Sequence, residues 1–224
     1  MDNRYLAAGG VGVLVIAAVV AAFVLLMPKT AQTEDMSGDA AATQVLAIGP
    51  EEATLGDPNA PIKFIEYAST SCPHCAAFTV QVMPEIQKNW IDTGKVYYVM
   101  RDFPLDNIAA AASAIARCLP KERFYPFMEV LFRNQSFWHS QNVPDPKEAL
   151  IELSRRAGLS REQVESCLKD KDVAARINKS RSDAENVLKI DSVPTMFING
   201  EKSSGAAAYS DFDAKFKALM PAPQ

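Results

Sequence analysis

The chain has 224 residues, of which 48% are apolar and four are cysteines. This length allows one substantial core, with room for an insertion, but hardly two full-sized independent domains. The formal net charge is −4, and the basic residues are scattered rather than clustered. We therefore expect no nucleic-acid partner.

An uncharged stretch runs without interruption from Leu6 to Met27, behind a short tail of residues 1–5. Its length matches the ~20 residues that a helix needs to cross the hydrocarbon core, so residues 6–27 are predicted to form a transmembrane signal anchor. The hydrophobic part of a cleaved signal peptide would be shorter, about 7–15 residues, and a cleavage site would follow it closely. Val20-Ala21-Ala22 is a possible but early site, so a cleaved soluble form is the less favoured alternative.

Residues 28–60 are rich in Ala, Thr, Gly, Asp and Pro and show no sustained period, which predicts a tether between the membrane and a folded domain at 61–224. That domain begins with strand composition at 62–68. A helix is expected from Pro73 onward, with Pro84 placing a kink inside it, and a second strand at 95–103. The order strand, helix, strand is typical of a parallel crossover.

A purely helical region is predicted next, at about residues 105–189. Local signals divide this region into several helices. The first starts at Asp106 or Asn107 and ends near Cys118, and the second carries the apolar stripe Phe124, Phe127, Met128 and Leu131. The capping box Asp145-Pro146-Lys147-Glu148 starts a third helix that stops at Gly158, the capping pair Ser160 and Gln163 starts a fourth, and a last helix is expected at 172–188. A strand at 195–198, the turn Asn199-Gly200 and a terminal helix complete the chain. The predicted fold class is α/β, with a sheet flanked by helices and interrupted by an all-helical insertion.

The strongest chemical signal is Cys72-Pro73-His74-Cys75, which directly follows the first strand and opens a helix. Two cysteines at this spacing can close and open a small disulfide, with the first sulfur exposed and the second shielded. The N–H groups and dipole at a helix start favour a thiolate at Cys72, and His74 can add positive charge or a hydrogen bond. The alternatives are an inert structural disulfide and half of a zinc site. Because the chain has only two histidines and no second two-cysteine motif, we expect no metal.

Four segments together resemble the DsbA-like family of thioredoxin-fold oxidoreductases, over about residues 61–205. They are Glu66-Tyr67, Cys72-Pro73-His74-Cys75, Arg101-Asp102-Phe103-Pro104-Leu105 and Val193-Pro194-Thr195 leading into Phe197-Ile198-Asn199-Gly200. The resemblance implies a thioredoxin fold with a central mixed sheet, and a redox-active Cys72–Cys75 disulfide with no further cofactor. It also implies that Pro194 is cis and that its loop, with Val193 and Pro73, contacts substrate beside the disulfide. The alternative is an ordinary trans proline at the start of an edge strand.

The resemblance extends to Glu66, which matches the buried acidic residue that the family places under the second cysteine. A carboxyl group buried there would have a raised pKa and could carry the proton of Cys75. The alternative is a half-exposed strand residue. The family histidine corresponds to His74, which could otherwise be a solvated residue at the helix start.

Two further pairs have mainly structural interpretations. Cys118 and Cys167 are expected to form a disulfide in an oxidising compartment, which would stabilise the fold by roughly 4 kcal/mol. Otherwise they are two buried thiols. Phe137-Trp138 could form an apolar wall near the site, but aromatic residues in a helical region are more often part of the core.

The sequence therefore predicts an extracytoplasmic thiol:disulfide oxidoreductase that oxidises the cysteines of reduced or unfolded secreted and periplasmic proteins through Cys72 and Cys75. We expect a monomer anchored in the inner membrane through residues 6–27, with its catalytic domain on the periplasmic side. The resemblance implies reoxidation by a DsbB-like, quinone-linked membrane protein. A disulfide isomerase or reductase with the same site is the first alternative, although Val193 before Pro194 resembles the oxidase form. A non-catalytic membrane-tethered chaperone or binding module is the second.

Overall fold

The computed structural model describes residues 38–139 and 143–221. The predicted anchor at residues 6–27 and the first part of the predicted tether lie outside the described residues. Within the described ranges, no helix is both long enough and apolar enough to cross a bilayer.

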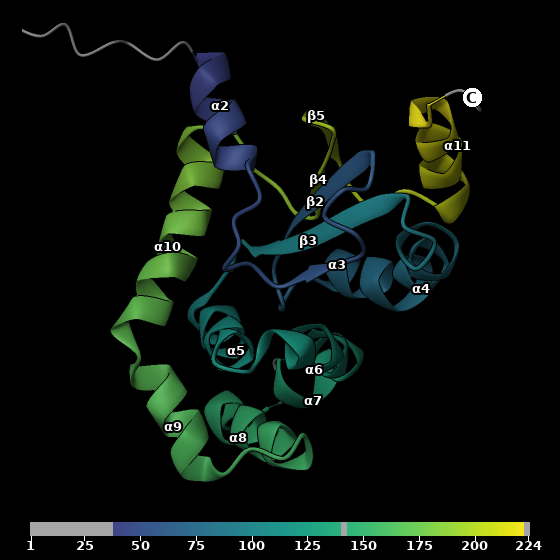
Figure 1. Cartoon of the computed structure of the whole chain (residues 1–224). Helices are drawn as coiled ribbons and strands as arrows, with labels where there is room; N and C mark the ends of the chain where they lie inside the picture. Colours follow the sequence, from purple (N-terminus) through teal and green to yellow (C-terminus); the bar gives the residue numbers. More distant parts are fainter. Residues whose placement is uncertain (1–37, 140–142, 222–224) are drawn as a thin grey trace, which may run out of the picture. The chain divides into compact units, whose positions relative to one another are not determined.

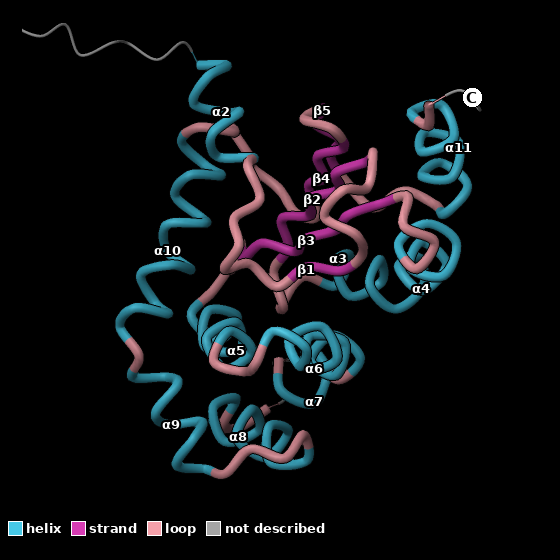
Figure 2. Tube along the Cα trace, viewed as in Figure 1, coloured by secondary structure: helices cyan, strands magenta, loops and turns pink. Residues whose placement is uncertain are grey.

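The described residues contain a five-stranded mixed sheet, which is surrounded by helices (Figures 1 and 2). In spatial order the strands are β1 (Thr54–Leu55), β3 (Val96–Asp102), β2 (Ile62–Ala68), β4 (Thr195–Ile198) and β5 (Glu201–Ser204). Strands β2 and β3 are parallel, whereas β4 is antiparallel to β2 and to β5. The predicted parallel crossover and the mixed sheet are both confirmed.

The helical segment after the cysteine pair is present but is not uniform. It comprises α3 (Pro73–Ala77), the π-helical segment η1 (Phe78–Val82), α4 (Met83–Ile86) and the π-helical segment η2 (Gln87–Ile91). Pro84 explains the first irregularity, because it has no N–H to donate and its ring would collide with the carbonyl four residues back in a regular helix. The predicted kink therefore takes the form of a π-helical turn just before this proline.

The described residues between β3 and β4 form helices only, which confirms the all-helical insertion (lower half and left side of Figure 1). These helices are α5 (Asn107–Arg117), α6 (Lys121–Arg133), α7 (Gln135–Trp138), α8 (Pro146–Arg156), α9 (Arg161–Lys169) and α10 (Lys171–Asn186). Ser160 and Gln163 form the predicted capping box. At Asp145 the predicted box is only half formed, since Asp145 caps α8 but Glu148 binds Arg161 instead. A charge-assisted, two-pronged pair with a guanidinium is stronger than a hydrogen bond to one backbone N–H.

Apolar side chains cover both faces of the sheet. Phe64 and Tyr98 belong to the larger cluster, which includes residues of α3, α4, the insertion and the terminal helix α11 (Tyr209–Leu219). Ile65 and Val99 belong to a second cluster, with residues of α10 and α2 (Gly38–Leu46). Because side chains alternate along a strand, Glu66 lies on the same face as Phe64, the face that α3 covers.

Residues 38–55 correct the prediction of a tether at 28–60, because they fold onto the domain as α2 and β1. The apolar side chains of α2 contact the second cluster without being fully buried themselves. A helix this short is marginal in isolation, even when it is rich in alanine, so its local sequence carries little signal. Contacts with the rest of the fold stabilise it instead.

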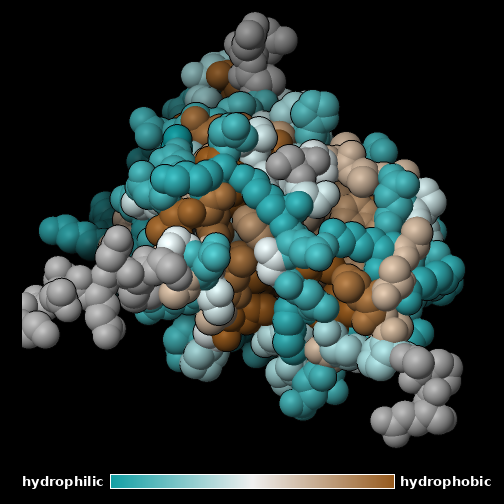
Figure 3. All heavy atoms as spheres, turned by 90° about the horizontal axis from the view of Figure 1, so that it is seen from above, coloured by the Kyte–Doolittle hydropathy of each residue, from teal (hydrophilic) through white to brown (hydrophobic). Residues whose placement is uncertain are grey.

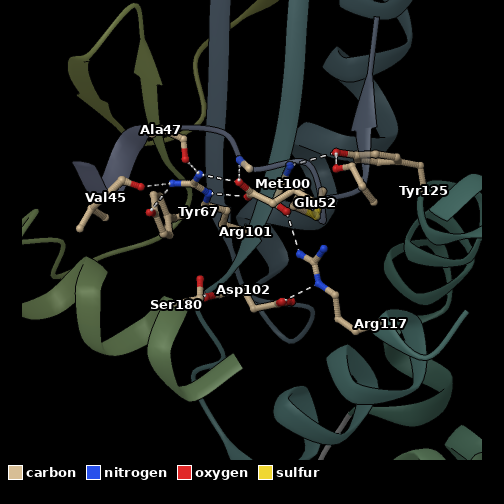
Figure 4. Close-up of polar contacts among 12 residues, drawn as sticks. Val45, Ala47, Glu52, Tyr67, Met100, Arg101, Asp102, Arg117, Tyr125 and Ser180 are labelled. Carbon is tan, nitrogen blue, oxygen red and sulfur yellow. Dashed lines mark hydrogen bonds and ion pairs between the residues drawn. The ribbon is translucent and has the colours of Figure 1, made fainter. Parts of the chain in front are cut away.

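Arg101 provides the main polar contact to this segment (Figure 4). Its guanidinium donates to the carbonyls of Val45 and Ala47, at 2.6 and 2.8 Å, at the carboxyl end of α2. It also donates to both carboxylate oxygens of Glu52, at 2.7 and 2.8 Å. A cation placed here satisfies carbonyls that the helix leaves unpaired and complements the helix dipole. Arg101 thereby ties residues 38–55 to β3.

Asp102 connects β3 to the insertion in a similar way (Figure 4). Its carboxylate accepts a hydrogen bond from Arg117 on α5 at 2.7 Å, and its backbone carbonyl accepts one from Ser180 on α10 at 2.9 Å. Arg117 also donates to the carbonyl of Met100 at 2.8 Å. The Arg101-Asp102 pair of the sequence motif therefore joins elements of the fold rather than taking part in chemistry.

Cys118 and Cys167 form a disulfide, as predicted, with Cα atoms 5.7 Å apart. It connects the end of α5 to α9, across a sequence separation of 49 residues. In the chain-entropy description, closing a loop of this size stabilises the fold by about 4 kcal/mol.

Candidate active site

The cysteine pair lies where the chain leaves β2 and begins α3. Cys72 is the N-cap residue of α3 and is 5% exposed, while Cys75 lies within the helix and is fully buried. Both cysteines are free thiols in this structure. Pro73 occupies the first turn, where its missing N–H leaves no hydrogen bond unmade, and Pro73 and His74 are both exposed. The predicted shielding of Cys75 is confirmed, but the prediction of an exposed first sulfur is wrong, because Cys72 is itself buried and is only slightly more accessible than Cys75.

The surroundings of Cys72 favour its thiolate form. The Cys75 thiol donates a hydrogen bond to Cys72, which favours the Cys72 thiolate, whereas burial opposes its ionisation. The backbone N–H groups of Cys75 and His74 and the charge of His74 also favour the thiolate. Together these effects lower the pKa of Cys72 to about 6. Burial, the hydrogen bond to Cys72 and the nearby Glu66 carboxylate all raise the pKa of Cys75. Cys72 is thus the thiol that ionises near neutral pH.

The loop before β4 lies against Cys72. The peptide bond between Val193 and Pro194 is cis, as the resemblance implies, and Pro194 is buried. The Cys72 thiol donates to the backbone carbonyl of Val193, with an S···O distance of 3.4 Å. Backbone groups of this loop are therefore next to any chain that becomes bonded to the Cys72 sulfur.

Glu66 is fully buried on β2, close enough to Cys75 to raise its pKa. The half-exposed alternative is therefore wrong. Desolvation raises the pKa of Glu66 to about 8, although Tyr98 donates its hydroxyl to Oε2 of Glu66 at 2.5 Å. Among the described residues, Oε1 of Glu66 has no hydrogen-bond partner. The carboxyl group is therefore mostly protonated at pH 7 and can donate a proton close to Cys75.

Two residues of this region are not predicted by the sequence. Tyr98 lies on β3 two positions before Met100, which is the parallel partner of Glu66. Gln135, on α7, donates through Nε2 to the backbone carbonyls of Thr70 and Cys72. Both depend on contacts between segments that are distant in the sequence, and no local motif marks either of them.

Phe137 and Trp138, the aromatic pair at the end of α7, differ in their exposure to solvent. Trp138 is fully buried and belongs to the core, as the sequence favours, whereas Phe137 is 40% exposed. Leu105, at 49%, is the other large apolar side chain that is exposed within the described ranges. The face seen in Figure 3 is mostly hydrophilic, with apolar side chains showing in the hollows between polar ones.

Metal ligands are not gathered anywhere in the described ranges: no group of three or more His, Cys, Asp or Glu residues there is arranged to hold an ion. The two thiols with Glu66 and the Pro194 loop are instead a constellation for thiol–disulfide exchange.

Known proteins resemble the chain in both sequence and structure. A family model described as Thioredoxin matches residues 49–218. The chain is 28% identical over 173 residues to a putative protein-disulfide oxidoreductase of Rickettsia bellii, covering 77% of this chain and 66% of that one. It is 27% identical over 172 residues to a probable disulfide bond formation protein D of Bacillus cereus, covering 75% of this chain and 77% of that one. The alignment thus spans just under two thirds of the length of the rickettsial relative.

Two solved structures give the same result at the level of the fold. The crystal structure of alpha-DsbA1 from Wolbachia pipientis superposes with a TM-score of 0.74 at 31% identity, over 80% of this chain and 95% of that one. The structure of oxidised BdbD from Bacillus subtilis superposes with a TM-score of 0.66, over 75% of this chain and 92% of that one. The identity to BdbD is 21%, so that likeness concerns the fold alone.

Proposed function

This chain belongs to the DsbA-like family of thioredoxin-fold protein-disulfide oxidoreductases, and on that premise we propose that it oxidises pairs of protein cysteines through Cys72 and Cys75. The observation that carries the proposal is the state of Cys72. Its pKa is lowered to about 6, and its sulfur lies against the cis Pro194 loop. A thiol with a low pKa is a good leaving group, so a disulfide that contains it is readily attacked.

The reaction begins with the Cys72–Cys75 disulfide. A substrate thiolate attacks the Cys72 sulfur, which forms a mixed disulfide and releases Cys75 with the electron pair of the broken bond. A second substrate thiolate then attacks the substrate sulfur of the mixed disulfide and releases Cys72 as a thiolate. The substrate loses two electrons and gains a disulfide, and the enzyme gains two electrons as its dithiol.

Glu66 has a defined role in the first step. Cys75 leaves in a buried environment that disfavours its thiolate, so it needs a proton as it departs. The protonated Glu66 carboxyl is placed to supply that proton, and Tyr98 holds the carboxyl group through its hydroxyl. In the reverse direction, the Glu66 carboxylate takes the proton of Cys75 as that thiol attacks.

The lowered pKa of Cys72 supports oxidation as the preferred direction. At pH 7, a thiol with a pKa of about 6 is about 90% ionised, against roughly 3% for an ordinary cysteine. This difference stabilises the reduced enzyme by about 1.4 kcal/mol, which corresponds to about 30 mV for a two-electron couple. The equilibrium between enzyme and substrate therefore moves by about tenfold toward the oxidised substrate.

Reduced or unfolded proteins are the proposed substrates. Such chains carry apolar side chains, and the exposed Leu105, whose backbone N–H donates to Ser69, offers an apolar contact near the loop that precedes Cys72. The Cys118–Cys167 disulfide supports an oxidising compartment outside the cytoplasm. We place the protein there as a monomer held at the inner membrane by residues 6–27, with a DsbB-like quinone-linked protein as its reoxidant.

Oxidation of a reduced protein tests this proposal. We expect the oxidised enzyme, mixed in equal amount with a reduced unfolded protein that has two cysteines, to convert it to the disulfide form while Cys72 and Cys75 become free thiols. The two products are counted by alkylation and mass spectrometry. If the target protein keeps its thiols and the enzyme keeps its disulfide, the oxidase function is wrong.

A further inference from the structure

The loop just before Cys72 is polar and yet buried. Ser69, Thr70 and Ser71 have exposed fractions of 0%, 1% and 8%. Buried polar groups are costly unless they form hydrogen bonds, so the partners of this loop are informative. The long-range hydrogen-bond partners of the loop residues lie between β3 and α8.

Side chains of the loop reach the start of the insertion. The Ser69 hydroxyl accepts a hydrogen bond from the backbone N–H of Leu105 at 3.2 Å. The Thr70 hydroxyl donates to the backbone carbonyl of Ala109, on α5, at 3.2 Å. These two contacts attach the loop to the insertion at a short distance from the reactive sulfur.

Gln135 makes the contact closest to Cys72. Its Nε2 donates to the carbonyl of Thr70 at 2.7 Å and to the carbonyl of Cys72 at 3.0 Å. Both partners are carbonyl acceptors, so the amide must present its NH₂ group to them. The helix that carries Gln135 is itself fixed, because Trp138 is fully buried and donates its indole N–H to the carbonyl of Leu131 at 2.9 Å.

The carbonyl of Cys72 belongs to an unusual peptide group. The next residue is Pro73, so this peptide has no N–H, and its carbonyl is its only hydrogen-bonding group. The carbonyl accepts one bond from the N–H of Ala76, at 3.1 Å, as part of the first turn of α3. Gln135 provides a second donor from outside that helix, and so fixes the plane of the peptide that carries the reactive residue.

Resting on the proposed function, we propose that Gln135 is a positioning residue for Cys72. Its amide holds the Cys72 carbonyl, and through the same backbone it keeps the sulfur beside the N–H groups of His74 and Cys75 at the start of α3. The insertion thereby sets the reactivity of the thiol through one side chain. Without the amide, the peptide plane can turn and the thiolate loses part of its stabilisation.

Gln135→Met tests this role, because methionine keeps the length and the apolar stem of the side chain but has no donor. We expect alkylation of Cys72 by iodoacetamide in the reduced variant to require a higher pH than in the wild type. The equilibrium with glutathione is expected to shift about fivefold toward oxidised enzyme and reduced glutathione, which corresponds to the loss of one net hydrogen bond. The variant is therefore a weaker oxidant than the wild type. Gln135→Glu, which turns carboxylate oxygens toward two carbonyls, should show a larger shift of the same sign.

Gln87→Met is the matched control, since Gln87 is exposed on η2, and it should leave both measurements unchanged. An alkylation profile of Gln135→Met that coincides with the wild type would overturn the proposal, even if the variant unfolds at a lower temperature. That outcome is distinct from a failure of the proposed function, in which the wild-type enzyme itself does not oxidise a reduced protein.

Discussion

Replacing Cys72 with alanine, Cys72→Ala, is expected to abolish the oxidation of reduced proteins. The remaining cysteine of the pair cannot form the active-site disulfide, and Cys75 is buried with a raised pKa, so it is a poor nucleophile on its own. The measurement is the loss of substrate thiols over time, at equal concentrations of enzyme and reduced protein. We expect a rate no higher than in buffer alone.

Cys75→Ala is the control for this variant. It also lacks the disulfide and should not oxidise a substrate, but its Cys72 stays nucleophilic and should form a stable mixed disulfide with oxidised glutathione. Mass spectrometry should therefore find the glutathione adduct in Cys75→Ala and not in Cys72→Ala. Undiminished oxidation by Cys72→Ala would show that the reactive sulfur lies elsewhere.

Glu66→Gln is expected to make the protein more stable at neutral pH while slowing its reaction. The glutamine cannot give a proton to Cys75, and general acid–base assistance of this kind contributes about 10²-fold or more in enzymes. We expect thiol–disulfide exchange to slow by about 100-fold or more at pH 7. Stopped-flow fluorescence of the exchange with a reduced peptide measures this rate.

The stability effect of Glu66→Gln has a defined dependence on pH. Burial raises the pKa of Glu66 to about 8 in the folded protein, against about 4.3 in the unfolded chain, so the folded state binds the proton more tightly. The wild type therefore loses stability as the pH rises from about 4 to about 8, and the variant lacks this loss. At pH 7 the variant should be more stable by about 2–3 kcal/mol, after about 1 kcal/mol is subtracted for the extra buried N–H of glutamine.

Urea unfolding at pH 5 and pH 8 measures this difference. Glu85→Gln is the matched control, since Glu85 is exposed on α4 and its replacement should leave stability nearly unchanged at both pH values. If the gain in Glu66→Gln were the same at pH 5 and pH 8, the raised pKa of Glu66 would be wrong.

The sequence predicts the elements whose signals are local. Strands β2 and β3 have apolar, branched and aromatic composition, and turn and cap residues bound the helices of the insertion. The cysteine motif, with its position between a strand and a helix, identifies the chemistry. The cis bond at Pro194 and the burial of Glu66 follow from the resemblance rather than from any local pattern.

The parts that the sequence does not predict depend on contacts between distant segments. The α2 segment has too little helix signal of its own and is fixed by Arg101, about fifty residues later, in the same motif that carries the resemblance. Tyr98 reaches Glu66 only because β2 and β3 pair in one particular register. Gln135 reaches Cys72 only because α7 packs beside the loop. None of these pairings leaves a pattern within a window of sequence.

The equilibrium of the Cys72–Cys75 pair with reduced and oxidised glutathione tests the oxidase proposal most directly. The fraction of reduced enzyme is measured by trapping its thiols at each glutathione ratio. We predict a reduction potential about 30 mV above the value of about −270 mV for thioredoxin, shifted toward the value of about −120 mV for DsbA by the stabilised Cys72 thiolate. A potential of about −270 mV or lower would contradict the account, because such a dithiol reduces protein disulfides instead of forming them.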